Sequence, residues 1–291
     1  MFTGKTIVIT GASSGIGWQI ACDLAGKGAY VIGIGRDAAR CEQARQRILQ
    51  STPQAQITFF VANLANQRQV RTLLQQISEL LDHEGLPLDI LINNAGLYSG
   101  RRSSTEDGIE LTFAVNHLAP FLLTHLALPH MKRAPEGRVI TVSSTSHYRA
   151  RLNPTRVFNP RLYVGITQYG VSKLCNVLFS AEFNRRANSN QLHAWAVDPG
   201  LVNTDIGLKN TGLLSRLVWR SRQKHGTSAE APSQTLLLLS SAPLAHIHHD
   251  LYWRDCQPQT PSKAALDPGL AQALWKESCR LCRIEDYFNP A

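Results

Sequence analysis

The sequence lacks two features that would tie it to a membrane or to export. No apolar run reaches the roughly 18 residues that are needed to cross a bilayer. The N-terminal stretch MFTGKTIVIT has no basic leading segment, and its apolar part runs directly into a glycine turn, unlike a signal peptide. We therefore expect a cytosolic protein, or one that faces the cytosol.

A framework of paired cysteines is also missing. The six cysteines are scattered along the chain, at Cys22, Cys41, Cys175, Cys256, Cys279 and Cys282. The last two form a CxxC pair, but no second pair accompanies them, so we expect reduced thiols and no zinc or redox site. We interpret His246, His248 and His249 as a solvated loop rather than metal ligands, and we predict no metal.

Carboxylates are scarce relative to basic groups. The chain has 21 Asp and Glu against 30 Lys and Arg, which gives a net charge of +9. This charge favours an anionic ligand or surface: a phosphorylated cofactor, an acidic membrane surface or nucleic acid. The basic residues are dispersed and no nucleic-acid-binding motif is present, so we expect no nucleic acid partner. Peripheral contact with a membrane and a homodimer both stay open.

Strand-like and helix-like segments alternate through most of the chain. The expected strands are apolar throughout, at 5–10, 30–33, 57–61, 90–93, 139–143, 193–197 and 251–253. The expected helices lie at 16–25, 37–50, 69–81, 109–131, 168–186 and 270–282. This pattern predicts an α/β fold with a Rossmann-type, doubly wound parallel sheet of about seven strands and helices on both faces. No repeat or linker divides the chain, so we predict one dinucleotide-binding catalytic domain over 1–291.

Two stretches interrupt the alternation, at about 144–168 and 203–228. Both follow strands and so lie at the carboxyl edge of the sheet, where ligands bind in this architecture. Within the second, residues 205–225 mix leucines and a tryptophan with basic residues. A mobile lid, a packed surface helix and a membrane-surface contact all fit this composition, and we favour the lid.

The first strand runs into a glycine-rich turn, TGASSGIG, that opens a helix. Glycines permit the tight turn, the approach of a pyrophosphate and close packing of helix on strand, and the helix N-terminus offers free N–H groups. The turn therefore predicts a dinucleotide site. Its expected members are Gly11, Ser13, Ser14, Gly15, Ile16 and Gly17.

The end of the second strand indicates which dinucleotide binds. NAD-binding folds place a carboxylate there, against the ribose 2′-hydroxyl. Here Gly35 occupies that position and Arg36 follows. An arginine can bind a 2′-phosphate that a carboxylate would repel, so we predict NADP(H). Asp37 is expected to cap the next helix.

Tyr169 and Lys173 are four residues apart in an expected helix and so share one face. A free tyrosine, with a pKa of about 10, is a poor base, but a nearby ammonium favours the phenolate. Such a tyrosine can exchange a proton with a carbonyl or alcohol oxygen. Ser143 ends a strand, and its hydroxyl is expected to hold that oxygen, with Ser144 and Thr145 as alternatives.

Together these motifs resemble the short-chain dehydrogenase/reductase family over about residues 5–204. The glycine turn matches TGxxxGxG, the segment at 93–96 matches NNAG, and Asp198-Pro199-Gly200 with Val202 and Thr204 matches PGxVxT. Asn63-Leu64 stands where the family often has Asp-Leu. The resemblance implies cofactor contacts from Asn63, Leu64, Asn94, Ala95, Gly96, Tyr169, Lys173, Pro199, Gly200, Val202 and Thr204.

The same resemblance gives Asn116 a role in a proton relay that reaches the lysine through water. It also points to a branch, because 26 positions separate Ser143 from Tyr169, about twice the usual gap. Such an insertion is similar to retinol dehydrogenases and protochlorophyllide reductases. We therefore expect hydride transfer between NADP(H) and a bulky, apolar small-molecule carbonyl or alcohol. A non-catalytic NADP(H) sensor and a ring reductase are the alternatives.

Overall fold

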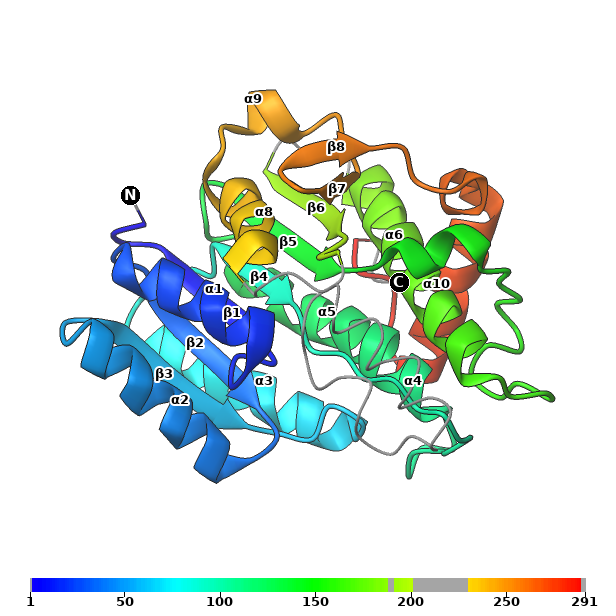
Figure 1. Ribbon diagram of the computed structural model, residues 1–291, viewed down its shortest axis with the longest axis horizontal. Coiled ribbons are helices and arrows are strands. Elements are labelled where there is room, and N and C mark those ends of the chain that lie inside the picture. The colour runs from blue at the N-terminus through cyan, green and yellow to red at the C-terminus, as the bar shows by residue number, and fades with distance from the viewer. Residues whose placement is uncertain (1, 188–190, 201–229, 289–291) are drawn as a thin grey trace.

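A computed structural model of the chain describes residues 2–187, 191–200 and 230–288 (Figure 1). In these residues the strands form one sheet, in the order β3-β2-β1-β4-β5-β6-β7-β8. Their bounds are β1 Thr6–Thr10, β2 Tyr30–Gly35, β3 Gln56–Val61, β4 Ile90–Asn93, β5 Gly137–Val142, β6 Leu192–Val197, β7 Tyr252–Arg254 and β8 Gln257–Gln259. The strands from β3 to β7 are parallel, as predicted.

The strand order reverses at β1, which pairs with β2 on one side and β4 on the other. Loops that leave these two neighbours at their carboxyl ends diverge, and the crevice between them is where ligands bind in doubly wound sheets. The glycine turn follows β1, and the residues matching NNAG begin at Asn93, the last residue of β4. The fold therefore places both motifs at the same crevice.

One strand was not predicted. β8 pairs antiparallel with β7, so the sheet has eight strands and is mixed rather than wholly parallel. All three of its residues are exposed, and it carries no apolar pattern that would reveal a strand. A two-residue turn, Asp255-Cys256, joins the two strands with both residues at positive φ, as tight hairpins require.

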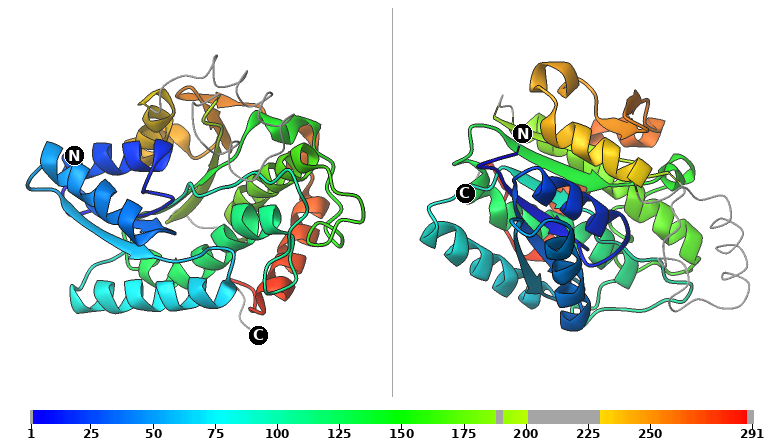
Figure 2. Two further views of the ribbon diagram at one scale, coloured as in Figure 1. Left: turned by 60° about the horizontal axis from the view of Figure 1, so that its bottom comes forward. Right: turned by 60° about the vertical axis from the view of Figure 1, so that its left-hand side comes forward.

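Helices cover both faces of the sheet, as predicted (Figure 2). One apolar core joins a sheet face to α1 Gly15–Gly26, α2 Ala38–Ser51 and α8 Glu230–Ser241. The other face packs on α3 Gln67–His83, α5 Ala119–Met131, α6 Gly165–Ala187 and α10 Pro268–Cys282. Asp37 caps α2 as expected, since its carboxylate accepts a hydrogen bond of 3.0 Å from the Arg40 N–H.

The helix predicted at 109–131 is continuous but not uniform. It consists of α4 Leu111–Phe113, a π-helical turn at Ala114–Leu118, and α5. By length and hydropathy alone, the segment Leu111–Met131 could cross a membrane. However, 78% of its most apolar window is buried inside the fold, as in the core helix of a globular domain.

The remaining segments include two that the sequence did not predict as helical. The short helix α9 Leu244–Ile247 precedes the exposed His248 and His249. In the stretch at 144–168, a 3₁₀ turn spans Thr145–Arg149 and α6 begins at Gly165. The stretch at 203–228, with its expected lid, lies outside the described residues, as do Val202 and Thr204.

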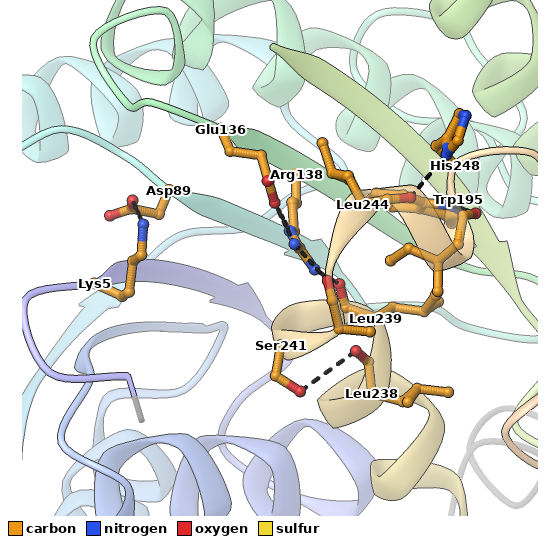
Figure 3. Close-up of polar contacts among 12 residues, drawn as sticks. Lys5, Asp89, Glu136, Arg138, Trp195, Leu238, Leu239, Ser241, Leu244 and His248 are labelled. Carbon is orange, nitrogen blue, oxygen red and sulfur yellow. Dashed lines mark hydrogen bonds and ion pairs between the residues drawn. The ribbon is translucent and has the colours of Figure 1, made fainter. Parts of the chain in front are cut away.

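The amino edge of the sheet carries paired charges (Figure 3). Lys5, before β1, lies 2.7 Å from Asp89, before β4. In β5, the buried Arg138 pairs with Glu136 and donates hydrogen bonds of 2.5 and 2.7 Å to the carbonyls of Leu239, in the last turn of α8, and Ala242, just after it. These bonds tie α8 to the sheet.

Candidate active site

The glycine turn is packed too tightly for side chains. Gly11 and Gly15 have φ values of +70° and +58°, which favour glycine. A Cβ at Gly17 would lie 2.3 Å from both the Gly11 carbonyl oxygen and Asn94 Nδ2. Asn94 in turn donates a hydrogen bond of 2.8 Å to the Thr10 carbonyl. The turn thus depends on its glycines, and Asn94 fixes it to the end of β4.

The N-terminus of α1 opens directly from this turn and fits a phosphate group. Ser14 occupies the N-cap position without a side-chain hydrogen bond to the helix, and the first turn contains no acidic residue. Ser14 and Gly15 are exposed, Ser13 is half-buried, and Ile16 packs into the core. The first N–H groups of the helix therefore meet no competing carboxylate, which suits the pyrophosphate of a dinucleotide.

At the end of β2, packing prevents a carboxylate at position 35. A Cβ on Gly35 would lie 2.3 Å from Cys41 Sγ and 3.2 Å from Ser13 Oγ. Arg36 is exposed, and among the described residues it forms no ion pair with a carboxylate. The acidic neighbour Asp37 is engaged in capping α2. The strand therefore ends in a free cation beside the glycine turn.

The residues after β3, for which adenine contacts were predicted, form a short loop at the carboxyl end of that strand. Asn63 is exposed, and its side-chain oxygen accepts a hydrogen bond of 3.1 Å from the Ala65 N–H, which shapes the loop. Leu64 packs partly against the core.

Tyr169 and Lys173 lie on the buried face of α6, with exposed fractions of 8% and 2%. Lys173 Nζ is 5.5 Å from the centre of the Tyr169 ring and donates a hydrogen bond of 2.9 Å to the Val142 carbonyl. Burial lowers the pKa of Lys173 to about 8, and the carboxylate of Asp198 opposes this shift. The sequence pairing of tyrosine and lysine thus becomes a spatial pair next to the end of β5.

Asn116 lies in the π-helical turn and is fully buried. Its side-chain oxygen accepts a hydrogen bond of 2.8 Å from the Leu97 N–H, and its nitrogen donates to the Leu97 carbonyl and to Ser172 Oγ. A Cβ at Gly96 would lie 3.5 Å from both Asn116 Oδ1 and Lys173 Nζ. Asn116 therefore joins the loop after β4 to α6, directly beside the lysine.

The two serines after β5 differ in environment. Ser143 is 1% exposed and donates its hydroxyl hydrogen bond, 2.8 Å long, to the Lys173 carbonyl. Ser144 is half-buried and accepts a bond of 3.2 Å from the Ser146 N–H. The hydroxyl of Ser143 is thus directed into the protein, whereas Ser144 is the more accessible of the two. Thr145 is exposed and begins the 3₁₀ turn.

Two residues near this centre were not predicted. Tyr98 lies edge-on to Tyr169, with ring centres 6.2 Å apart. Its position two residues after Gly96, the last residue of the NNAG segment, could have indicated that it lies near the site. Asp198, after β6, is 2% exposed and lies 3.7 Å from Arg254. Its other oxygen accepts a bond of 2.9 Å from the Gly200 N–H, which shapes the Pro199-Gly200 turn.

Comparison with known proteins agrees with this geometry. Residues 5–211 match the short chain dehydrogenase family. Retinol dehydrogenase 12 of Mus musculus is 34% identical over 282 residues, which cover 97% of this chain and 87% of that protein. Dehydrogenase/reductase SDR family member 13 of Bos taurus is 36% identical over 290 residues, covering 97% and 74%.

A solved structure also resembles the whole chain. The crystal structure of an uncharacterized protein from Mycobacterium Paratuberculosis superposes with a TM-score of 0.74 at 32% identity. The superposition covers 99% of this chain and 96% of that one. The similarity therefore extends beyond residues 5–211, the part that matches the family.

Proposed function

The chain belongs to the short-chain dehydrogenase family, and from this membership we propose that it is an NADP(H)-dependent oxidoreductase of carbonyls and alcohols. One observation carries the proposal. Tyr169 and Lys173 lie together at the carboxyl edge of the sheet, on the side that the glycine turn of β1 also faces. Several relatives are named retinol dehydrogenases, which supports a bulky, apolar substrate such as a retinoid, steroid or long aldehyde.

The residues present fit a bound dinucleotide. The turn at Gly11–Gly17 and the N-terminus of α1 would hold the pyrophosphate, Arg36 the 2′-phosphate, and Asn63 and Leu64 the adenine. Ala95 and Gly96, next to Lys173, and Pro199 and Gly200, after β6, would line the nicotinamide half. When bound, NADP(H) supplies or accepts the hydride.

The protein groups manage the proton and the substrate oxygen. During reduction, Tyr169 Oη donates a proton to the carbonyl oxygen, and during oxidation it takes the proton from the alcohol. The Lys173 ammonium, held by the Val142 carbonyl, stabilises the phenolate that remains. The accessible hydroxyl of Ser144 is better placed than that of Ser143 to orient the substrate oxygen. Asn116 holds the loop and helix on which this arrangement depends.

Replacing Tyr169 by Phe tests the catalytic part of the proposal. We expect Tyr169→Phe to lower kcat by about 10³-fold, because general acid catalysis contributes about 10²–10⁴-fold, while the affinity for NADPH is retained. NADPH consumption with aldehydes, retinoids, steroids and quinones measures the first quantity, and NADPH fluorescence titration measures the second. Tyr30→Phe is the matched control, because the Tyr30 hydroxyl forms its hydrogen bond with Thr58 on the distant strand β3. Wild-type protein that binds NADPH but oxidises none would instead indicate a sensor.

Arg36→Asp tests the cofactor preference. An arginine–phosphate contact contributes about 1.5–3 kcal/mol, and the new carboxylate repels the phosphate. We expect the ratio of kcat/KM for NADPH to that for NADH to fall by about 10²-fold. Arg40→Asp makes the same charge change one helical turn further on, at another exposed residue, and should leave the ratio nearly unchanged. An unaltered ratio in Arg36→Asp would remove Arg36 from the cofactor site.

A further inference from the structure

A cluster of apolar side chains projects from the segment that enters α6. Leu162, Val164 and Ile166 are 89%, 57% and 45% exposed. They account for half of the large hydrophobic residues that are exposed in the described part of the chain. Isolated apolar residues on a surface need no explanation, but three within five residues mark a contact surface.

The intervening residues hold this cluster outward. Tyr163 points inward, where its hydroxyl donates a hydrogen bond of 2.8 Å to the Ser99 carbonyl. Gly165 is buried, and a Cβ there would lie 2.3 Å from the same Ser99 oxygen. Because positions 163 and 165 are fixed against the 99–100 segment, their neighbours cannot turn in to cover themselves. The exposure is built into the fold.

Three arginines that form no ion pair with the described residues lie near the cluster. Arg161 is adjacent in sequence, and Arg101 and Arg102 follow the segment on which Gly165 packs. Arg102 also hydrogen-bonds to Asn159, which places it beside the same loop. No ion pair joins these arginines to a carboxylate in the residues that the structure describes. The sequence from Gly137 to Ala181 contains no Asp or Glu at all.

The position of this surface relates it to the active site. Ile166 precedes Tyr169 by about one turn of α6. Tyr98, whose ring meets Tyr169, has its hydroxyl 3.0 Å from the position that a Cβ on Gly165 would take. The loop between β5 and α6 projects from the body of the molecule at the right of Figure 1. Any partner bound here would lie next to the reacting group.

We propose that Leu162, Val164 and Ile166, with Arg101, Arg102 and Arg161, form a docking surface for an anionic phospholipid bilayer. The apolar side chains can enter the acyl-chain region of such a membrane, while the flanking arginines bind its anionic headgroups. An acidic protein partner would satisfy the arginines but leave the protruding leucine and valine without a reason to be exposed. Delivery of an apolar substrate from the bilayer to Tyr169 rests on the proposed function, but docking itself does not.

Vesicle co-sedimentation of the full chain tests the proposal. Binding is expected to vesicles of phosphatidylcholine and phosphatidylserine in a ratio of about seven to three, and not to phosphatidylcholine alone. Each arginine near an anionic surface contributes about fivefold to partitioning, so R101Q/R102Q should weaken binding by about 25-fold. L162S/V164S should weaken binding most at high salt. Salt screens the attraction between the arginines and the headgroups, so the apolar contact is then the main attraction that remains.

The matched controls are L266S and K263Q, at an exposed leucine and lysine of the turn Lys263–Leu266 on a different surface. Both should bind vesicles like the wild type. The affinity of every variant for NADPH, measured without vesicles, reports folding independently of any turnover. Wild-type protein that binds neither vesicle, or equal losses in the control variants, would overturn the proposal. So would concentration-dependent self-association that L162S/V164S abolishes, because a second copy would then be the occupant.

Discussion

The two edges of the sheet treat buried charge differently. At the amino edge, Arg138 donates to Glu136 and to two backbone carbonyls, and Asp89 accepts from both Lys5 and the Thr6 N–H. At the carboxyl edge, Lys173 donates a single hydrogen bond among the described residues. Oδ2 of Asp198 and Oδ1 of Asn176 are buried there without a hydrogen-bond partner in the described part of the chain, although Oδ2 faces Arg254 at 3.7 Å.

This difference separates groups that hold the fold together from groups that are held ready for a ligand. A buried polar group costs free energy unless it is hydrogen-bonded, so the amino edge is arranged for stability. Burial at the other edge lowers the pKa of Lys173 to about 8. An amine whose donors and charge are incompletely satisfied can still bind a ribose hydroxyl and influence a phenol. The carboxyl edge therefore retains binding capacity at the expense of stability.

Exchanging the two cations for methionine should separate these roles most clearly. We expect Lys173→Met to lower kcat/KM by about 10³-fold, since the phenolate of Tyr169 loses its cation. Stability near pH 7 should increase, because a buried charge is removed and the Val142 carbonyl still accepts a bond of 3.1 Å from Asn176. Steady-state kinetics and urea unfolding measure the two effects.

Arg138→Met is the counterpart at the amino edge. It should lower the free energy of unfolding by roughly 3 kcal/mol, because two buried carbonyls lose their donors, while kcat/KM of the folded enzyme stays unchanged. The comparison fails if both substitutions reduce activity and stability in the same proportion.

The dependence of stability on pH should carry a signature of Lys173. The pKa of this lysine is lowered from 10.5 to about 8, so between these values the unfolded chain binds more protons than the folded one. The free energy of unfolding therefore rises as the pH increases from about 8 to 10.5, by at most about 3 kcal/mol from this group. Below pH 8 the penalty is fully present.

Urea unfolding of cofactor-free wild type and Lys173→Met across this range isolates the contribution, because the titrations of cysteines and tyrosines cancel in the difference. Wild type should be the less stable of the two at pH 7, and the gap should close by about pH 10.5. A gap that is constant with pH would mean that Lys173 titrates normally in the fold.

The sequence predicted most of the parallel sheet because its strands are short apolar runs, each followed by an amphipathic helix. The expected helix at 37–50 corresponds to α2 Ala38–Ser51, and the capping role of Asp37 is confirmed. β8 was missed because an exposed edge strand such as Gln257–Gln259 needs no apolar side chains. The π-helical turn around Asn116 was also missed. Its Asn116 side chain accepts a hydrogen bond from the Leu97 N–H and donates one to Ser172 Oγ, and both partners are remote in sequence.

Local sequence patterns predicted a site correctly in shape where one motif determines its own backbone geometry, as in the glycine turn. They did not predict the burial and partners of a side chain where these depend on contacts between segments distant in sequence. Asp198 illustrates this limit: the segment Asp198-Pro199-Gly200 indicated a turn, but not that its carboxylate is buried near Arg254 and influences the pKa of Lys173. Tyr98 likewise meets Tyr169 only through the packing of the loop after β4 on α6.

The smallest effects concern the adjacent Ser143 and Ser144, which the sequence could not tell apart. Ser143→Ala removes only the hydrogen bond to the Lys173 carbonyl, so we expect about 1 kcal/mol lower stability and nearly unchanged kcat. Ser144→Ala removes the accessible hydroxyl, and kcat should fall about tenfold, because Tyr169 still donates to the substrate oxygen. Ser144→Thr keeps a hydroxyl and should recover part of the rate.

Steady-state kinetics and thermal unfolding of the three variants decide between the serines. If kcat falls more in Ser143→Ala than in Ser144→Ala, then Ser143 is the serine that binds the substrate oxygen. Its hydroxyl would then have to turn away from the Lys173 carbonyl when substrate binds.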